Sequence, residues 1–199
     1  MKKTIYVLAL ITVFFSSCKN NKSVKDSGTM NSSEIKMDSM NEMKMDSVTS
    51  TSMTTSKNKI TTPIIDAYLQ LKNALVADDK LAAADAAKTI LKTFLNFDMS
   101  KLSSDEHKKY MEIIEDAKEQ AEHIAKSPID HQREHFESLS TDVNDLIALL
   151  GTEKTLYQDF CPMAGEGKGA IWLSEFKDIK NPYQGSKMLS CGNLKTQIN

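Results

Sequence analysis

Residues 63–150 contain four stretches in which apolar side chains recur every three or four positions, and this pattern limits the fold more than any other feature. Such spacing places the apolar side chains on one face of an α-helix. The expected helices span residues 63–77, 80–96 and 103–127, and a fourth follows Pro128 and ends at Leu150. Because only short links separate them, we expect a mainly α fold, an antiparallel four-helix bundle.

Residues that commonly begin and end helices stand at the ends of these segments. Pro63 follows Thr62 and occupies a first helical position, where proline is favoured. Ser103 to Glu106 has the sequence of a capping box. Gly151 follows the fourth segment, as glycine often follows a helix C-terminus. These residues support the four helices and set their boundaries.

The beginning of the chain has the features of a sorting signal. Lys2-Lys3 is followed by an apolar run from Ile5 to Phe15 and then by Ser16-Ser17-Cys18. The run is about half the ~20 residues that a membrane-spanning helix needs. Small residues directly before a cysteine resemble the lipobox of bacterial lipoproteins, which implies a signal peptide over residues 1–17 and a lipid on Cys18. The alternative is an ordinary secretory signal whose cleavage removes Cys18.

Either kind of signal directs the protein out of the cytoplasm. Acyl chains on Cys18 would anchor it to a membrane without a spanning helix. No aspartate stands just after Cys18, which favours sorting to the outer membrane. We therefore expect a lipid-anchored protein of the cell envelope, attached to the outer membrane and facing the periplasm.

Residues 18–59 lack aromatic side chains and consist mainly of Ser, Thr, Asn, Lys and Met. Such a segment cannot bury enough apolar surface to offset the entropy of ordering it, so we expect a disordered tether. Methionine thioethers are soft ligands that suit Cu(I) and, by the same logic, Ag(I). Four methionines of the tether are candidate low-affinity ligands: Met37, Met40, Met43 and Met45. A spacer with an accidental methionine content explains the same sequence.

Beyond Gly151 the helical spacing ends and other residue types become frequent. Residues 157–199 hold two of the three cysteines and the only tryptophan. Apolar runs at Leu156–Phe160 and Ala170–Leu173 flank a glycine-rich turn and are expected to pair as a hairpin. We expect this otherwise irregular C-terminal segment to pack on the helices, within one folded domain over residues 60–199.

Cysteine and methionine occur together near both ends of this segment, as Cys161 with Met163 and as Met188 with Cys191. Two thiolates and two thioethers form a soft ligand set that favours Cu(I). A disulfide explains the two cysteines equally well, because oxidising compartments favour disulfides. On the chain-entropy model, closing that loop would stabilise the fold by about 3–4 kcal/mol. Met163 and Met188 would then be ordinary core residues.

Four short motifs lie in the same segment: Cys-Pro-Met-Ala (161–164), Gly-Ala-Ile-Trp-Leu-Ser (169–174), Ile-Lys-Asn-Pro-Tyr-Gln-Gly (179–185) and Met-Leu-Ser-Cys-Gly (188–192). With Gln132-Arg133, Phe136 and Leu139-Ser140 of the preceding helix, they resemble the signature of an uncharacterised bacterial envelope family, domain of unknown function 3347. The resemblance covers about residues 64–199. It implies a helical domain that occurs in envelope lipoproteins and fused to periplasmic adaptors of heavy-metal efflux pumps. It therefore implies heavy-metal handling, chiefly of copper, and supplies no mechanism. Gln184 departs from the pattern, where an aromatic residue is expected.

The run His131-Gln132-Arg133-Glu134-His135 matches the zinc motif H-x-x-E-H of inverted metalloproteases. Those enzymes are large α/β proteins, and the rest of this chain is too short for that fold. His131 or His135 could instead join the sulfur ligands, and two histidines with two cysteines would make a zinc site. Otherwise both are polar residues on the flank of a helix. We expect His107 and His123 to be solvated and Arg133, the only arginine, to form a fixed ion pair.

Together these features predict a metal-binding envelope protein that is not an enzyme. We expect it to bind Cu(I), with Ag(I) or zinc as alternatives, and to buffer the ion or pass it to an efflux-pump adaptor. The alternative is an interaction module that is closed by a Cys161–Cys191 disulfide and docks a partner protein without metal. The net charge of −2 at pH 7 excludes a nucleic-acid binder with a basic stripe.

Overall fold

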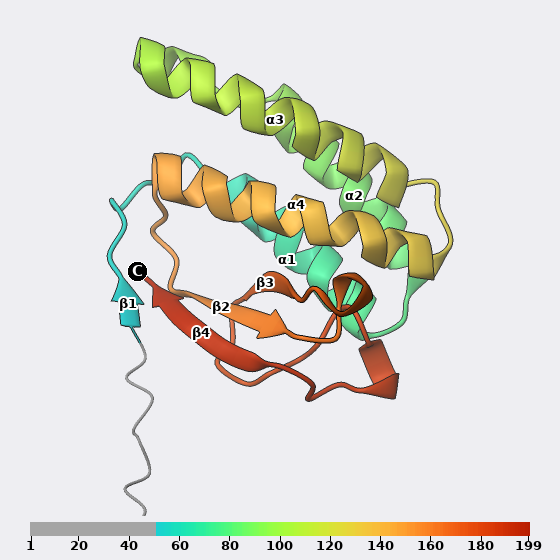
Figure 1. Cartoon of the computed structure of the whole chain (residues 1–199). Coiled ribbons are helices and arrows are strands. Elements are labelled where there is room, and N and C mark those ends of the chain that lie inside the picture. Colours follow the sequence, from blue (N-terminus) through green and yellow to red (C-terminus); the bar gives the residue numbers. More distant parts are fainter. Residues whose placement is uncertain (1–50) are drawn as a thin grey trace, which may run out of the picture. The chain divides into compact units, whose positions relative to one another are not determined.

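A computed structural model of the chain describes residues 51–199 (Figure 1). This part contains four helices: α1 (Thr62–Val76), α2 (Lys80–Leu95), α3 (Ser104–Ile124) and α4 (Ile129–Leu150). It also contains four strands: β1 (Thr51–Met53), β2 (Leu156–Cys161), β3 (Ala170–Ser174) and β4 (Asn193–Ile198). The fold is mainly α with a C-terminal strand region, as the sequence predicts.

Each predicted helix is present, and the capping box and Gly151 act as expected. Helix α1 begins at Thr62, one residue before the predicted Pro63, and α3 ends at Ile124, before the predicted limit at residue 127. The side chains of Ser103 and Glu106 form the predicted capping box at the start of α3. Gly151 ends α4 with a φ of +80°, in the region that favours glycine. A Cβ atom at this position would lie 2.0 Å from the carbonyl oxygen of Ser56, so close packing also requires glycine there.

The helices pack in sequence order, α1 against α2 and α3 against α4, with α2 also contacting α3 (Figure 1). The buried face of α2 is formed by small and medium side chains, with Ala83, Ala87 and Ile90 fully buried. Small side chains of this kind let neighbouring helices approach closely. None of the helices in residues 51–199 is long and apolar enough to cross a membrane.

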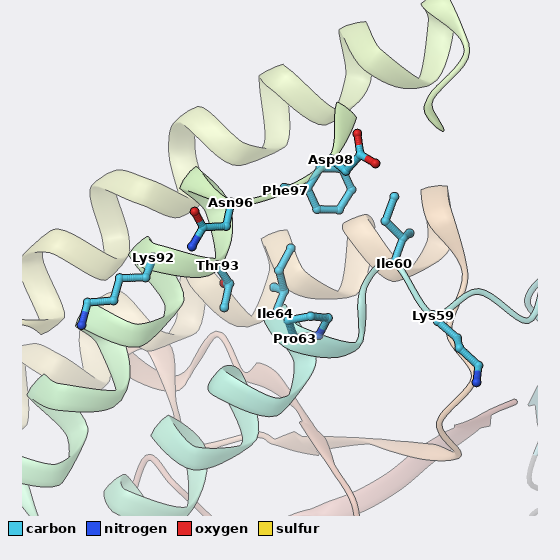
Figure 2. Close-up of a pocket in the computed structure, with 9 residues that line it drawn as sticks. All are labelled: Lys59, Ile60, Pro63, Ile64, Lys92, Thr93, Asn96, Phe97 and Asp98. Atoms are coloured by element: carbon cyan, nitrogen blue, oxygen red, sulfur yellow. The ribbon is translucent and has the colours of Figure 1, made fainter. Parts of the chain in front are cut away.

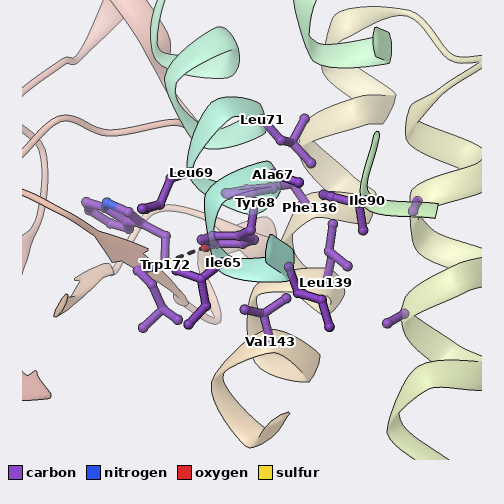
Figure 3. Packing of buried hydrophobic residues seen from close by; sticks show 14 of the residues in the cluster. Ile65, Ala67, Tyr68, Leu69, Leu71, Ile90, Phe136, Leu139, Val143 and Trp172 are labelled. Carbon is purple, nitrogen blue, oxygen red and sulfur yellow. Dashed lines mark hydrogen bonds between the residues drawn. The ribbon is translucent and has the colours of Figure 1, made fainter. Parts of the chain in front are cut away.

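Tyr68 of α1 connects the helices to the sheet at the centre of the core (Figure 3). Its ring stacks on Phe136 of α4 at a centroid distance of 5.2 Å. Its hydroxyl lies 2.8 Å from Ser140 Oγ and accepts a hydrogen bond of 3.1 Å from the backbone N–H of Leu173. One buried residue therefore links α1, α4 and β3, and its only polar atom is satisfied.

The strands form one sheet in the order β1-β4-β2-β3. The antiparallel pairing of β2 with β3 runs from Tyr157↔Ser174 to Cys161↔Ala170, which confirms the predicted hairpin. The expectation of an otherwise irregular C-terminal segment was wrong, because β4 pairs antiparallel with β2. Leu194 and Ile198 alternate with polar residues in β4, which is the spacing of a half-buried strand.

The predicted limit of the tether at residue 59 was also wrong. Strand β1 pairs parallel with β4, with Met53 opposite Ile198. Further along, the N–H of Thr55 donates to the carbonyl of Asn199 at 2.8 Å, and the side-chain amide of Asn58 donates to the carbonyl of Leu150 at 2.9 Å. Backbone hydrogen bonds need no apolar side chain, so this polar segment can close the free edge of β4.

The remaining N-terminal predictions lie outside the described residues. They are the signal peptide over residues 1–17, the lipid on Cys18, and the candidate ligands Met37, Met40, Met43 and Met45.

Candidate functional site

The structure brings together the two cysteines that the sequence separates by thirty positions. Cys161 is the last residue of β2, and Cys191 lies in the turn that precedes β4. Their Sγ atoms are 3.6 Å apart and both thiols are free. Cys161 is completely buried, whereas Cys191 is partly exposed. Solvent therefore reaches the pair from the side of Cys191.

Asn181 holds the segment that carries Cys191. Its side-chain N–H donates to the carbonyl of Cys191 at 2.6 Å, and its own N–H donates to the carbonyl of Leu189 at 2.8 Å. Its Oδ1 accepts from the N–H groups of Tyr183 and Gln184. Asn181 was not among the predicted site residues, although the dipeptide Asn-Pro is a turn signal.

Gly192 allows the same segment to approach the core. A Cβ atom at this position would lie 2.8 Å from Cη2 of Trp172 and 2.9 Å from the carbonyl oxygen of Phe160. The residue after Cys191 must therefore be glycine for the chain to pass over the indole ring. This packing keeps Cys191 next to the end of β2.

Arg133 attaches the start of the segment that leads to Cys191 to the helices, and it forms the ion pair that the sequence predicts. Its Nε donates to the carbonyl of Pro182 at 2.9 Å, and Nη2 donates to the carbonyl of Leu75 at 2.9 Å and to Oδ1 of Asp78 at 2.5 Å. Hydrogen bonds with Ser186 and Arg133 lower the pKa of Asp78 to about 2. The segment from Pro182 to Ser186 is thus attached to the turn between α1 and α2.

A small movement of the two sulfur atoms would bring them to the separation found on a shared metal ion or to that of a disulfide bond. Two thiolates on one tetrahedral ion at ~2.3 Å would lie about 3.8 Å apart, and a disulfide bond needs about 2.05 Å. The hydrogen bond with Cys161 is the main reason why the pKa of Cys191 is raised. A metal that binds the sulfur of Cys191 must therefore displace its proton.

The two methionines of the predicted sulfur set are exposed. Met163 retains 54% and Met188 40% of their accessible surface. Their alternative interpretation as core residues was therefore wrong. The carbonyl of Met188 accepts a hydrogen bond of 3.0 Å from the N–H of Cys191, so the two residues share one turn. The thioethers are accessible to an ion that arrives from solution.

His131 and His135 lie with a third histidine and not in a group with the cysteines. Within residues 51–199, the one group of three or more His, Cys, Asp or Glu ligand atoms of suitable spacing comprises His123, His131 and His135. Each of their ligand atoms lies within 4.8 Å of the others. The zinc site of two histidines and two cysteines is therefore wrong. His123 is exposed, as expected, and it also belongs to this group; its spacing in the sequence did not indicate this, because the packing of α3 on α4 brings it there.

The histidine group is held by side chains of the same two helices. Nδ1 of His131 lies 2.6 Å from Oε2 of Glu134, and Nδ1 of His135 lies 2.7 Å from Oε1 of Gln120. The ring of His123 stacks on that of His135 at a centroid distance of 4.3 Å. Burial and the two neighbouring histidines lower the pKa of His135.

A third polar group lies between α1 and the sheet. Lys72 is fully buried and its Nζ lies 2.8 Å from Oε2 of Glu175. Asp159 of β2 is also fully buried, and among the described residues neither of its carboxylate oxygens has a hydrogen-bond partner. Burial raises the pKa of Asp159 to about 7, although the charge of Lys72 opposes this shift.

A cavity of about 350 Å³ lies between the beginning of α1 and the end of α2 (Figure 2). Ile60, Pro63, Ile64 and Phe97 form its apolar wall, and its polar lining includes Lys59, Lys92 and Asp98. None of the predicted ligands lines this cavity. It is therefore separate from the candidate metal ligands.

Residues 64–155 match the model of a family described as "Protein of unknown function (DUF3347)". The match confirms the family resemblance over the helices, and it ends before β2, so both cysteines lie beyond the matched residues. No curated protein and no solved structure matches the chain.

Proposed function

Because residues 64–155 are a domain of the DUF3347 family, whose description names no activity, we propose a function from the side chains themselves. The protein is a lipoprotein of the cell envelope that binds a soft metal ion, Cu(I), and buffers it or passes it to efflux machinery. Cys161 and Cys191 are the principal ligands, and Met163 and Met188 support them. Ag(I) suits the same sulfurs, and zinc would use the thiolates. The role is binding and involves no catalysis.

The separation of 3.6 Å between the two Sγ atoms carries this proposal. It is close to the ~3.8 Å expected for two thiolates on one tetrahedral ion. Soft sulfur ligands select Cu(I) over the hard cations, which prefer oxygen. The ion therefore requires little movement of either strand end.

Differences in exposure suggest a direction of entry. The exposed Met163 and Met188 and the partly exposed Cys191 meet an incoming ion first, and the buried Cys161 completes its coordination. Exchange of one sulfur at a time would let the ion leave towards a partner without release into solution. An efflux-pump adaptor is the proposed partner.

The remainder of the fold acts as the scaffold. We take the helices as an antiparallel bundle on which Arg133 and Asn181 hold the segment before Cys191. Ligands that are fixed before binding lose little further entropy when the ion arrives.

The N-terminal sequence supplies the proposed location. A signal peptide over residues 1–17 and a lipid on Cys18 would anchor the domain to the outer membrane, on the periplasmic side. The tether methionines Met37, Met40, Met43 and Met45 would collect ions weakly.

Anaerobic titration with Cu(I) in the presence of a competing chelator tests the proposal. We expect one tightly bound ion per chain, and at least a tenfold loss of affinity for Cys161→Ser and Cys191→Ser. Met163→Leu and Met188→Leu should weaken binding less, and Met111→Leu, an exposed methionine of α3, should have no effect.

Thiol counting on protein isolated without reductant distinguishes metal binding from the alternative function, an interaction module closed by a disulfide. An inaccessible Cys161–Cys191 disulfide, together with no Cu(I) bound after reduction, would establish the interaction module and refute the metal carrier.

A further inference from the structure

The group of His123, His131 and His135 has a geometry that the sulfur pair does not explain. His131 and His135 stand four residues apart on α4 and share one face, and His123 reaches them from the end of α3. The Nε2 atoms of His131 and His135 are 3.0 Å apart. His123 and His131 are exposed and His135 is partly buried, so an ion can reach all three.

The partners of the two Nδ1 atoms determine where the imidazole lone pairs lie. Glu134 Oε2 and Gln120 Oε1 are hydrogen-bond acceptors, so each Nδ1 carries a hydrogen atom. In the neutral rings both Nε2 atoms then present lone pairs, which repel each other across 3.0 Å. A positive charge between the lone pairs removes this repulsion.

The same contacts form the outer layer that metal-binding histidines usually have. A ligating imidazole almost always donates its second N–H to a carboxylate or a carbonyl, which fixes the ring and the tautomer. Glu134 and Gln120 act in this way on His131 and His135. Two imidazole nitrogens on a tetrahedral ion at ~2.0–2.1 Å would lie about 3.3–3.4 Å apart, close to the distance found here.

We propose that His123, His131 and His135 bind one borderline divalent cation, Cu²⁺ or Zn²⁺, at a second site. Imidazole suits both ions, and the usual order of stability places Cu²⁺ above Zn²⁺. Three nitrogen ligands leave at least one position for water or for a ligand from another molecule. The site is independent of the proposed Cu(I) ligands, because it uses none of the sulfur atoms.

The lowered pKa of His135 agrees with this assignment, since a metal binds the neutral imidazole. The carboxylates of Glu119 and Glu134 face His135 and attract a cation.

The test uses the full chain with all three cysteines replaced, Cys18→Ser, Cys161→Ser and Cys191→Ser, so that thiolates cannot contribute. Competition titrations with Cu²⁺ and with Zn²⁺ should give one ion per chain. His123→Gln, His131→Gln and His135→Gln should each weaken binding at least tenfold. Gln120→Ala should weaken it by about 10–100-fold, because it removes an orienting contact.

His107→Gln is the matched control, since His107 is an exposed histidine of the same helix α3 as His123. It should leave the affinity unchanged. Electron paramagnetic resonance of the Cu²⁺ complex should show nitrogen coupling that is reduced in His131→Gln, whose side chain is exposed.

Three results would overturn the assignment. They are coordination by oxygen alone, unchanged binding in His131→Gln with His135→Gln, or an equal loss of affinity in His107→Gln. Loss of this site while Cu(I) binding persists in the cysteine-containing chain would leave the function proposed above intact.

Discussion

Arg133 Nη2 donates to Asp78 Oδ1 at 2.5 Å, and this ion pair joins α4 to the turn between α1 and α2. The same guanidinium donates to the carbonyl of Pro182, at the start of the segment that leads to Cys191. The only arginine of the chain therefore connects the helices with the candidate metal ligands.

Arg133→Met should lower the free energy of unfolding by about 2–3 kcal/mol, because charged donors to two carbonyls and a carboxylate are lost. Urea unfolding measures this change, and Cu(I) affinity should fall with it because the Cys191 segment loses its attachment. Asp130→Asn is the control, since Asp130 is exposed and lies 3.8 Å from Arg133. If Arg133→Met is as stable as the parent, Arg133 does not hold the Cys191 segment to the helices.

Asp78 should make the protein sensitive to acid. Its folded-state pKa of about 2 is below the unfolded value of 3.8, so its contribution is fully present above pH ~4 and is lost as the pH falls towards 2. Asp78→Asn should lower stability at pH 6 and flatten its decline between pH 4 and pH 2. Thermal unfolding across this range is the measurement, and an unchanged slope would contradict the prediction.

Asp159 should act in the opposite direction. Burial raises its folded-state pKa to about 7, above the unfolded-state pKa of 3.8. The contribution of the protonated carboxyl to stability is therefore fully present below pH 3.8 and is lost as the pH rises through 7. Asp159→Asn should therefore increase the free energy of unfolding at pH 8, by on the order of 2–4 kcal/mol, and much less at pH 4.

Denaturant unfolding of Asp159→Asn at both pH values provides the check. Asp178→Asn is the control at an exposed position. Equal effects of Asp159→Asn at pH 4 and pH 8 would show that burial of the charge is not the cause.

Asn181→Ala should cost about 2–4 kcal/mol of stability, because a buried backbone group of Tyr183 and partly buried ones of Cys191 and Gln184 lose their partner. Alkylation of Cys191 should become faster as its segment loosens, which mass spectrometry can follow at each cysteine. Asn193→Ala, at an exposed position of β4, should change neither quantity. Unchanged alkylation in Asn181→Ala would show that this amide does not position Cys191.

The helices and the hairpin were predictable because their signals are local. Apolar spacing, the capping box at Ser103 and the glycine after Leu150 each act within a few residues of the chain. The pairing of Cys161 with Cys191 was predicted only as a hypothesis, from residue chemistry. The addition of β1 to β4 was missed, because edge pairing uses backbone groups that every residue type has.

The sequence by itself determined the four helices, the turn between β2 and β3, and the presence of soft ligands near both ends of the C-terminal segment. Only the tertiary structure decided which of these ligands meet. Cys161 and Cys191 meet where β4 pairs with β2, and Arg133 and Asn181 contact the segment before Cys191. His123 meets His131 and His135 where α3 packs on α4. Residues far apart in the chain are brought together by the whole folded arrangement, and local spacing holds no information about such distances.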